Sequence, residues 1–384
     1  MIERHVKTQI EYYLKADSRK IFFLWGPRRS GKTTILNDIS SKLSVPIFNF
    51  DLISDRELFA PARDILEKIA SEHKVILIDE VQNYPESTVA LKILYDEFNV
   101  KIIATGSSEL RQKGANFDTL AGRFTESYCL PLSIEEINKN SQIKEYAKNN
   151  FQEKTTNNLQ IFGAYPEVYA NNMLSESEKI DLLQNILDTY VLKDIINIYD
   201  LKNEKLAKDI LTKIALQIGS EVSVRELANS FGANAATVSS YIEIFIKNYI
   251  LIPLPSFKTN TRKAVSENRK LYFYDLGIRN ILVKDFRDLE LRPDKGGVFE
   301  NFIVSEIEKK RKNMQAKQSM YFYREYGGHE IDLVLENYKK EYNCIEMKTD
   351  KRRAGKDIFP LPHSFAIINS QNYFKEITEL FTVR

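Results

Sequence analysis

The hydrophobic pattern of the first third of the chain alternates between short apolar runs and amphipathic stretches. Short, predominantly apolar runs fill residues 21–25, 45–50, 75–78 and 100–105. Apolar side chains at helical spacing mark residues 5–16, 33–43 and 62–70. Continuous apolar runs are typical of strands that are buried on both faces of a parallel sheet. Strands that alternate with helices in this way predict a doubly wound α/β sheet.

A phosphate-binding pattern follows the first predicted strand. The pattern is Gly26-Pro27-Arg28-Arg29-Ser30-Gly31-Lys32-Thr33, and Thr34 continues it into the next helix. Its glycines let successive backbone N–H groups converge on phosphate oxygens, and the positive end of the helix faces the same anion. We expect Lys32 to reach the β- and γ-phosphates, and the Thr33 hydroxyl to ligate Mg²⁺. The strand before and the helix after the pattern indicate a nucleotide-binding loop.

Two carboxylates end the third apolar run, at Asp79-Glu80. We expect Asp79 to hold Mg²⁺ through water and Glu80 to polarise the attacking water. The fourth run ends in Gly106-Ser107-Ser108, where one of the two serines is expected to sense the γ-phosphate; we place Ser107 among the nucleotide contacts. The acid pair favours hydrolysis over phosphoryl transfer to a metabolite. The nearest Asn-Lys, at 138–139, lacks the aspartate that reads guanine, which favours ATP over GTP.

Length and composition bound the remaining possibilities. The 384 residues are enough for two to four domains. A net charge of +2 gives no overall preference for nucleic acid or membrane. Cys129 and Cys344 show no metal or redox spacing, so we expect both to lie in the core of a protein from a reducing compartment. The charged N-terminus and the lack of a long apolar run predict a cytoplasmic protein without a membrane span.

The middle of the chain carries a different pattern. Between residues 205 and 282, three short helical segments are followed by two apolar strands, which is the order of a winged helix. We expect Asn234 to cap the third helix, whose exposed hydroxyls would face phosphates or bases. Four basic side chains near the wing are further candidates for nucleic-acid contact: Arg262, Lys263, Arg269 and Lys270. The third helix carries no arginine fork for guanine edges, so a protein-contact role stays open.

A second chemical constellation lies in the last hundred residues. Asp332 and the sequence Glu346-x-Lys348 lie on two hydrophobic strands, and Glu300 lies on a helix before them. Glu346 and Lys348 share one face of their strand because side chains alternate with period two. This order is the pattern of restriction-endonuclease-like sites. We expect Glu300, Asp332 and Glu346 to hold Mg²⁺ or Mn²⁺, and Lys348 to assist attack by a metal-bound water. Whether the site cuts nucleic acid or only binds it stays open.

Taken together, these motifs resemble the AAA-type ATPases of bacteria and archaea that carry a C-terminal domain of unknown function with a nuclease-like core. The resemblance rests on residues 26–34, 79–82, 105–108, 120–123 and 130–133 and covers the whole chain. It implies an ATPase of the additional-strand class, with the strand at 102–105 between the phosphate-loop and acid-pair strands. It also implies that Arg123 completes a transition-state clamp, in cis or from a neighbouring subunit of a homo-oligomer.

These observations predict four parts. They are a P-loop ATPase core at 1–135, a helical lid at 136–204, a winged helix at 205–284 and a restriction-endonuclease-like α/β domain at 285–384. The favoured function is an ATP-hydrolysing protein that acts on nucleic acid. The alternatives are a signalling switch that binds a protein partner and a nucleotide-dependent scaffold, both with an inactive C-terminal domain.

Overall fold

The chain forms two compact units in the computed structural model, Met1–Pro131 and Leu132–Arg384. The structure describes residues 2–106, 117–141, 143–171, 173–194, 203–258, 269–325, 327–349 and 357–381. The division falls four residues before the predicted end of the ATPase core at 135. Each unit has its own sheet or sheets and its own core, so the two are described separately.

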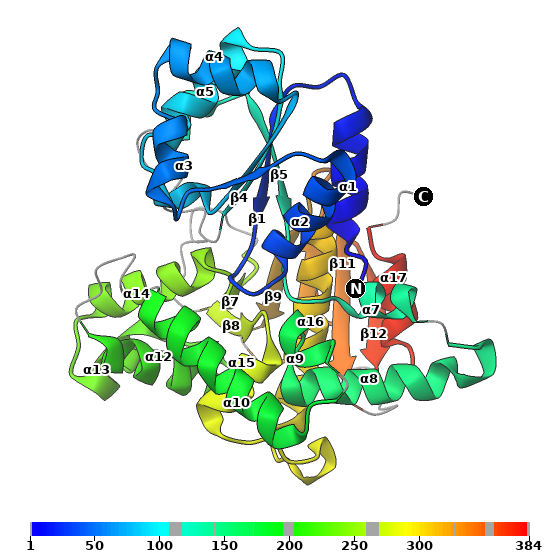
Figure 1. Ribbon diagram of the computed structural model, residues 1–384. Coiled ribbons are helices and arrows are strands. Elements are labelled where there is room, and N and C mark those ends of the chain that lie inside the picture. Colours follow the sequence, from blue (N-terminus) through cyan, green and yellow to red (C-terminus); the bar gives the residue numbers. More distant parts are fainter. Residues whose placement is uncertain are drawn as a thin grey trace. The chain divides into compact units, whose positions relative to one another are not determined.

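The first unit is built on a five-stranded parallel sheet with the order β2-β3-β4-β1-β5 (Figure 1). Its strands are β1 (Ile21–Trp25), β2 (Ile47–Asn49), β3 (Val75–Asp79), β4 (Lys101–Gly106) and β5 (Phe124–Tyr128). β4 lies between β1 and β3, as expected of the additional-strand class. All five residues of β1 are buried, which explains why its sequence is an unbroken apolar run.

Helices cover both faces of this sheet (Figure 1). They are α1 (His5–Lys15), α2 (Lys32–Leu43), α3 (Ile53–Leu58), α4 (Arg63–Glu72), η1 (Val81–Asn83), α5 (Ser87–Glu97) and η2 (Phe117–Leu120). The apolar faces of α1 and α2 pack on β1 and β4 in one buried cluster. Ile10 from α1 and Leu36 from α2 are fully buried there, so the helical spacing in the sequence corresponds to this contact.

The second unit begins with helices and a three-stranded sheet that share one core. The helices are α7 (Ile134–Asn140), η3 (Glu145–Ala147), α8 (Lys148–Phe162), α9 (Pro166–Tyr169), α10 (Glu176–Ile186), the π-helical η4 (Leu187–Asp194), α12 (Glu204–Leu216), α13 (Val224–Phe231), α14 (Ala235–Lys247) and α15 (Leu276–Val283). The strands are β6 (Glu221–Val222), β7 (Leu251–Pro255) and β8 (Arg269–Phe273), in the order β6-β8-β7. One hydrophobic cluster runs from Phe162 to Leu282 and crosses the predicted boundary at 204/205.

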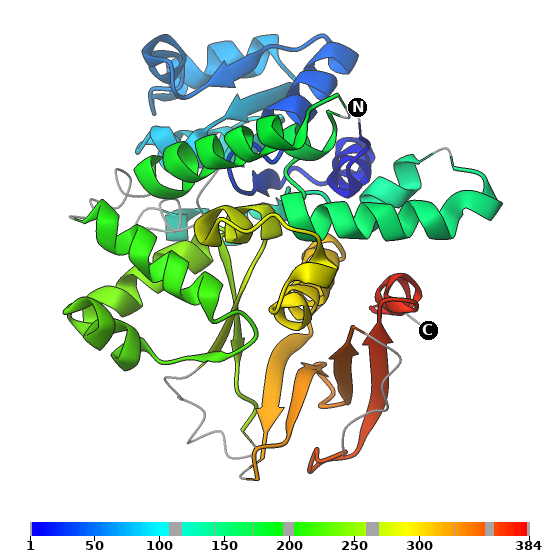
Figure 2. The ribbon, with the colours of Figure 1, turned by 90° about the horizontal axis from the view of Figure 1, so that it is seen from below.

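A four-stranded sheet with the order β12-β11-β10-β9 completes the second unit (Figure 2). The elements are η6 (Leu289–Leu291), α16 (Lys295–Asn313), β9 (Ser319–Arg324), β10 (Glu330–Glu336), β11 (Tyr342–Lys348), β12 (His363–Asn369) and α17 (Tyr373–Glu379). β9, β10 and β11 are antiparallel, and β12 is parallel to β11. Phe257, which follows β7, packs in the core of this sheet against Phe359. Its backbone N–H donates to the Phe322 carbonyl at 2.7 Å, so the β7–β8 hairpin is joined to β9.

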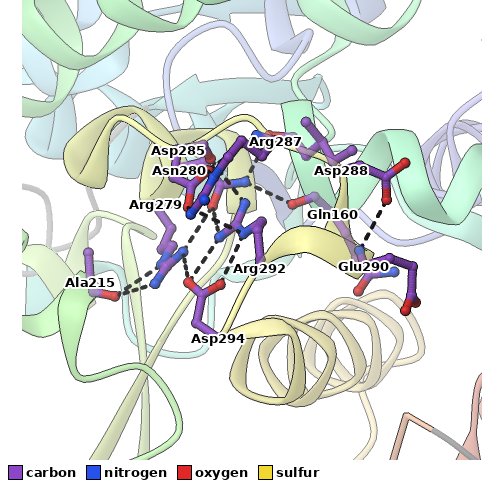
Figure 3. Close-up of polar contacts among 11 residues, drawn as sticks. Gln160, Ala215, Arg279, Asn280, Asp285, Arg287, Asp288, Glu290, Arg292 and Asp294 are labelled. Carbon is purple, nitrogen blue, oxygen red and sulfur yellow. Dashed lines mark hydrogen bonds and ion pairs between the residues drawn. The ribbon is translucent and has the colours of Figure 1, made fainter.

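A buried arginine pair fixes the segment between α15 and α16 (Figure 3). The Arg279 guanidinium donates to the Ala215 carbonyl at 2.8 and 3.0 Å and pairs with Asp294 at 2.6 Å. Arg292 also binds Asp294, at 3.0 Å, and donates to the Asp285 carbonyl at 3.0 Å. Both arginines are at most 2% exposed. This network connects the end of α12, α15 and the start of α16.

Candidate functional site

The phosphate loop follows β1 at the carboxyl edge of the sheet, and the backbone geometry accounts for both of its glycines. A Cβ at Gly26 would lie 2.0 Å from the Cys129 carbonyl oxygen, so no side chain fits there. Gly31 has a φ of 100° and precedes the first residue of α2. Such a backbone favours glycine. The loop therefore turns directly into the positive end of a twelve-residue helix.

Lys32 is buried inside the loop. Its ammonium donates to the carbonyl oxygens of Gly26 at 2.9 Å and Pro27 at 2.8 Å. Burial lowers the pKa of Lys32, and the nearby charges of Glu80 and Asp79 oppose that shift. The side chain is thus a cation that is already positioned inside the loop.

Asp79 joins the loop to two neighbouring strands. The Thr33 hydroxyl donates to Oδ2 of Asp79 at 2.7 Å, and the Thr105 hydroxyl donates to Oδ1. Thr33 opens α2, Asp79 ends β3, and Thr105 lies near the end of β4, so the parallel strands bring their carboxyl ends to one point. The sequence predicted Thr33 and Asp79 together. It did not identify Thr105, because serines two and three residues later were the obvious hydroxyls.

Glu80 is held by Gln82. The Gln82 amide donates to the Glu80 carboxylate, and the Gln82 side chain is 1% exposed. Glu80 itself has a φ of 54°, which a non-glycine residue adopts at a strained or functional turn. Sequence reasoning noted Gln82 only as part of the family motif.

The remaining predicted contacts lie around the loop. Arg28, Arg29 and Thr34 are partly or fully exposed, and the Ser30 hydroxyl donates to the Pro27 carbonyl at 2.8 Å. Ser107 lies outside the described residues. A contact that the sequence did not indicate comes from Arg4, which is 8% exposed and donates to the Ser30 carbonyl at 2.6 Å and to the Leu130 carbonyl. An arginine three residues after the N-terminus carries no local pattern that would have pointed to the loop.

Arg123 lies at the amino-terminal ends of the parallel strands, whereas the phosphate loop lies at their carboxyl-terminal ends. It precedes β5, and its carbonyl accepts from the backbone N–H of Ile21, the first residue of β1. The loop begins after the last residue of β1, so the length of a five-residue strand, about 16 Å, separates the two. The guanidinium is bound to both oxygens of Asp96, at 2.8 and 3.0 Å. The prediction that Arg123 acts on the γ-phosphate therefore does not hold in cis.

The second unit brings three carboxylates together, but not the predicted three. Oxygens of Glu300, Glu330 and Asp332 lie within 4.8 Å of one another. Glu346 is not part of this group, although it lies one residue beyond the register pair Leu333 and Ile345, next to Asp332. The prediction of Glu346 as a third ligand is corrected in favour of Glu330. Glu330 and Asp332 are two residues apart on β10 and alternate with the buried Ile331 and Leu333, so strand geometry places both carboxylates on one face.

A buried lysine forms ion pairs with two of these three carboxylates. Lys270, at 1% exposure, donates to Glu300 at 3.0 Å and to Glu330. Burial alone would lower the pKa of Lys270, but the charges of Glu300 and Glu330 raise it above its ordinary value. Burial, together with the Glu300 charge, raises the pKa of Asp332 to about 7. The predicted catalytic Lys348 lies 3.6 Å from Glu346 instead, on the same face of β11.

The basic side chains expected to contact nucleic acid are largely engaged within the protein. Arg269 pairs with Glu243 at 2.7 Å, and Lys270 is buried among carboxylates. The expectation is therefore wrong for Lys270, because a buried lysine bound to carboxylates cannot meet a phosphate, whereas Arg269 keeps a partly exposed side chain and stays a prediction. Arg262 and Lys263 lie outside the described residues. The expected cap of α14 is confirmed, since the Asn234 side chain accepts from the Ala236 N–H at 2.8 Å.

Two further expectations concern the whole chain. Both cysteines are buried and free, as predicted. Among the described residues, no helix combines the length and the apolar composition that crossing a membrane requires.

Three family matches follow one another along the chain. Residues 18–138 match an AAA domain, residues 153–290 match a domain of unknown function, and residues 295–370 match a second domain of unknown function. The first match supports a P-loop ATPase domain around the site described above. The second spans the core shared by α8 to α15 and, like that core, crosses the predicted boundary at 204/205.

Individual proteins resemble the chain more distantly. An uncharacterised protein, MJ1544, of Methanocaldococcus jannaschii is 26% identical over 360 residues, covering 88% of this chain and 78% of its own. An uncharacterised protein of Haemophilus influenzae is 24% identical over 297 residues, covering 72% of each chain. Among solved structures, the Walker-type ATPase PABY2304 of Pyrococcus abyssi has a TM-score of 0.46 at 16% identity, over 74% of this chain and 96% of that one.

Proposed function

We propose that the first unit binds ATP and hydrolyses it in the presence of Mg²⁺. The observation that carries the proposal is the meeting of Lys32, the Thr33–Asp79 hydrogen bond and Glu80 at the end of the parallel sheet. The AAA-domain match at 18–138 supports it independently of the geometry. Loop N–H groups, the α2 terminus and Lys32 all present positive charge to one place, which suits the β- and γ-phosphates.

The oxygens around Asp79 fit a magnesium ion. Thr33 and Asp79 are 2.7 Å apart, and both are the hard oxygen ligands that Mg²⁺ takes in nucleotide sites. The ion, when bound, neutralises charge on the transferred phosphoryl group. Thr105 holds the other Asp79 oxygen, which keeps the carboxylate oriented toward Thr33. Ser107 stays a proposed contact from the segment that follows β4.

Each remaining residue has a separate role in hydrolysis. Lys32 would move from the loop carbonyls to the phosphates, where its ammonium regains a strong counter-charge. Glu80 would orient the attacking water, with Gln82 fixing the rotamer of its carboxylate. Because Arg123 is a strand length away from its own loop, we propose that it acts on ATP bound by a second copy of the chain. A homo-oligomer is then the active form.

Nucleotide binding is the first test of this proposal. We expect the wild-type protein to bind Mg-ATP in isothermal titration, and Lys32→Ala to lose measurable binding. Lys42→Ala removes an exposed lysine from the same helix and should bind normally. Equal binding by wild type and Lys32→Ala would contradict the role of the loop.

We also propose that residues 205–284 form a winged helix that contacts nucleic acid. The order helix, strand, helix, helix, strand, strand from α12 to β8 supports the fold. On the capped helix α14, Thr237 and Ser240 are exposed, so their hydroxyls are available to phosphates.

Electrophoretic mobility shifts of duplex and single-stranded nucleic acid across a salt series test whether this domain contacts nucleic acid. Binding should weaken as salt rises and with Thr237→Glu; an unshifted probe at low salt would favour the alternative, a switch that binds a protein partner.

The last part of the proposal concerns residues 285–384. A helix, three antiparallel strands and a parallel fourth strand support a restriction-endonuclease-like arrangement. The predicted Mg²⁺ or Mn²⁺ ion does not fit the carboxylates as they stand, because an internal ammonium binds two of the three. We therefore attach no cleavage step to Glu300, Asp332, Glu346 or Lys348.

A further inference from the structure

The most unusual charge arrangement in the second unit surrounds Lys270. This residue lies on β8, in the three-stranded sheet, yet its ammonium binds Glu300 on α16 and Glu330 on β10. Its side chain is 1% exposed, so the ammonium has exchanged its water for these carboxylates. A buried lysine is costly unless it is paired and hydrogen-bonded, and here it is both.

The surrounding contacts extend the pairing in both directions. The Tyr272 hydroxyl, two residues along β8, donates to the same oxygen of Glu300. Arg324 on β9 donates to Glu330 at 2.8 Å and to Glu221 on β6 at 2.7 Å. Opposite charges therefore alternate from β6 through β9 and β10 to β8 and α16. Two of the three grouped carboxylates are matched by an internal cation.

We propose that Lys270 is the built-in cation of this carboxylate centre, and that it fastens the β7–β8 hairpin to the C-terminal sheet in the place where a nuclease-like site would hold a divalent metal ion. The proposal does not depend on ATP binding or hydrolysis. It makes the centre a joint between two parts of the second unit. It also explains why Glu330, which the sequence pattern did not include, lies in the group.

The packing beside the centre supports a joint. Phe257, two residues beyond the end of β7, is buried among aromatic side chains of the C-terminal sheet, including Phe359 at a ring-centroid distance of 5.0 Å. The hairpin is thus held at two points, by an aromatic contact at Phe257 and by an ionic contact at Lys270. To admit a phosphodiester between Glu300 and Asp332, the protein would have to break the ion pairs of Lys270.

Manganese binding to the full-length protein without nucleotide tests the proposal. We expect Lys270→Met to acquire one Mn²⁺ site, measured by electron paramagnetic resonance, because the group of three carboxylates then loses the ammonium that Glu300 and Glu330 share. The double variant Lys270→Met/Asp332→Asn should lose that site again. Lys270→Arg keeps the charge and should acquire none. The melting temperature of Lys270→Met should fall without Mn²⁺ and recover with it, as expected of a ligand that binds the native state.

Mn²⁺ binding to the wild-type protein provides a second test of the proposal. Its Mn²⁺ binding, if any, should be unchanged by Asp332→Asn, because no metal is expected at this centre. A wild-type Mn²⁺ site that Asp332→Asn removes would overturn the proposal, as would a folded Lys270→Met protein that acquires no site. The wild-type comparison keeps its meaning even where Lys270→Met does not fold.

Discussion

At the scale of single residues, the proposed hydrolytic site depends on side chains that fix other side chains. Thr105 orients Asp79, and Gln82 orients Glu80. Both side chains are buried, at 0% and 1% exposure. Water therefore cannot take over their hydrogen bonds to Asp79 and Glu80 when either residue is substituted. A buried hydrogen bond to a charged group contributes about 1.5–3 kcal/mol, which corresponds to roughly 10- to 100-fold in rate.

Replacing Gln82 should therefore lower turnover without weakening nucleotide binding. We expect Gln82→Leu to reduce kcat by about 10- to 100-fold with little change in KM, because the Glu80 rotamer is no longer fixed. Asn83→Ala, at the next position of the same turn, is the matched control and should behave as wild type. Steady-state ATPase assays give both parameters; an unchanged kcat would return Gln82 to a purely structural role.

At the scale of elements, local patterns predicted more than long-range contacts did. The phosphate loop follows from a local sequence pattern, whereas the order of β1, β4 and β3 was expected from the family resemblance alone. The contact of Lys270 with Glu300 and Glu330 could not be predicted, since it joins strands far apart in the chain. Glu330 could have been found from the sequence, because it lies two residues before Asp332 on the same strand and shares its face. Arg4 could not, because its partners are backbone carbonyls of loops far along the chain.

The buried arginine pair gives an element-scale prediction (Figure 3). Arg292 is bound to Asp294 and is fully buried, whereas Arg287 pairs with Asp285 at an exposed fraction of 59%. Breaking a buried pair by removing one partner costs about 3–5 kcal/mol, and an exposed pair contributes about 0–1 kcal/mol. Arg292→Met should thus lower the free energy of unfolding by several times more than Arg287→Met. Urea unfolding of both variants measures this, and similar losses would contradict a structural role for the network.

At the scale of the whole molecule, the proposed role of Arg123 in trans involves a second copy of the chain. Arg123→Ala should bind ATP normally and turn it over more slowly, by a factor of about 10³ to 10⁵ for an arginine finger. Arg63→Ala removes another exposed arginine, one that pairs with Glu97 on α5, and should retain activity. Mixing Arg123→Ala with Glu80→Gln protein should restore part of the turnover, because one interface then carries both intact groups. Mixtures without any recovery would contradict action in trans.

The central claim is that the first unit hydrolyses ATP with Glu80 as the residue that activates water. Single-turnover hydrolysis of Mg-ATP by wild type and Glu80→Gln, with nucleotide affinity measured in parallel, tests it most directly. The account predicts that Glu80→Gln binds ATP as tightly as wild type and loses at least about 100-fold of the hydrolysis rate, within the range of general-base catalysis. Equal hydrolysis rates in the two proteins would contradict it.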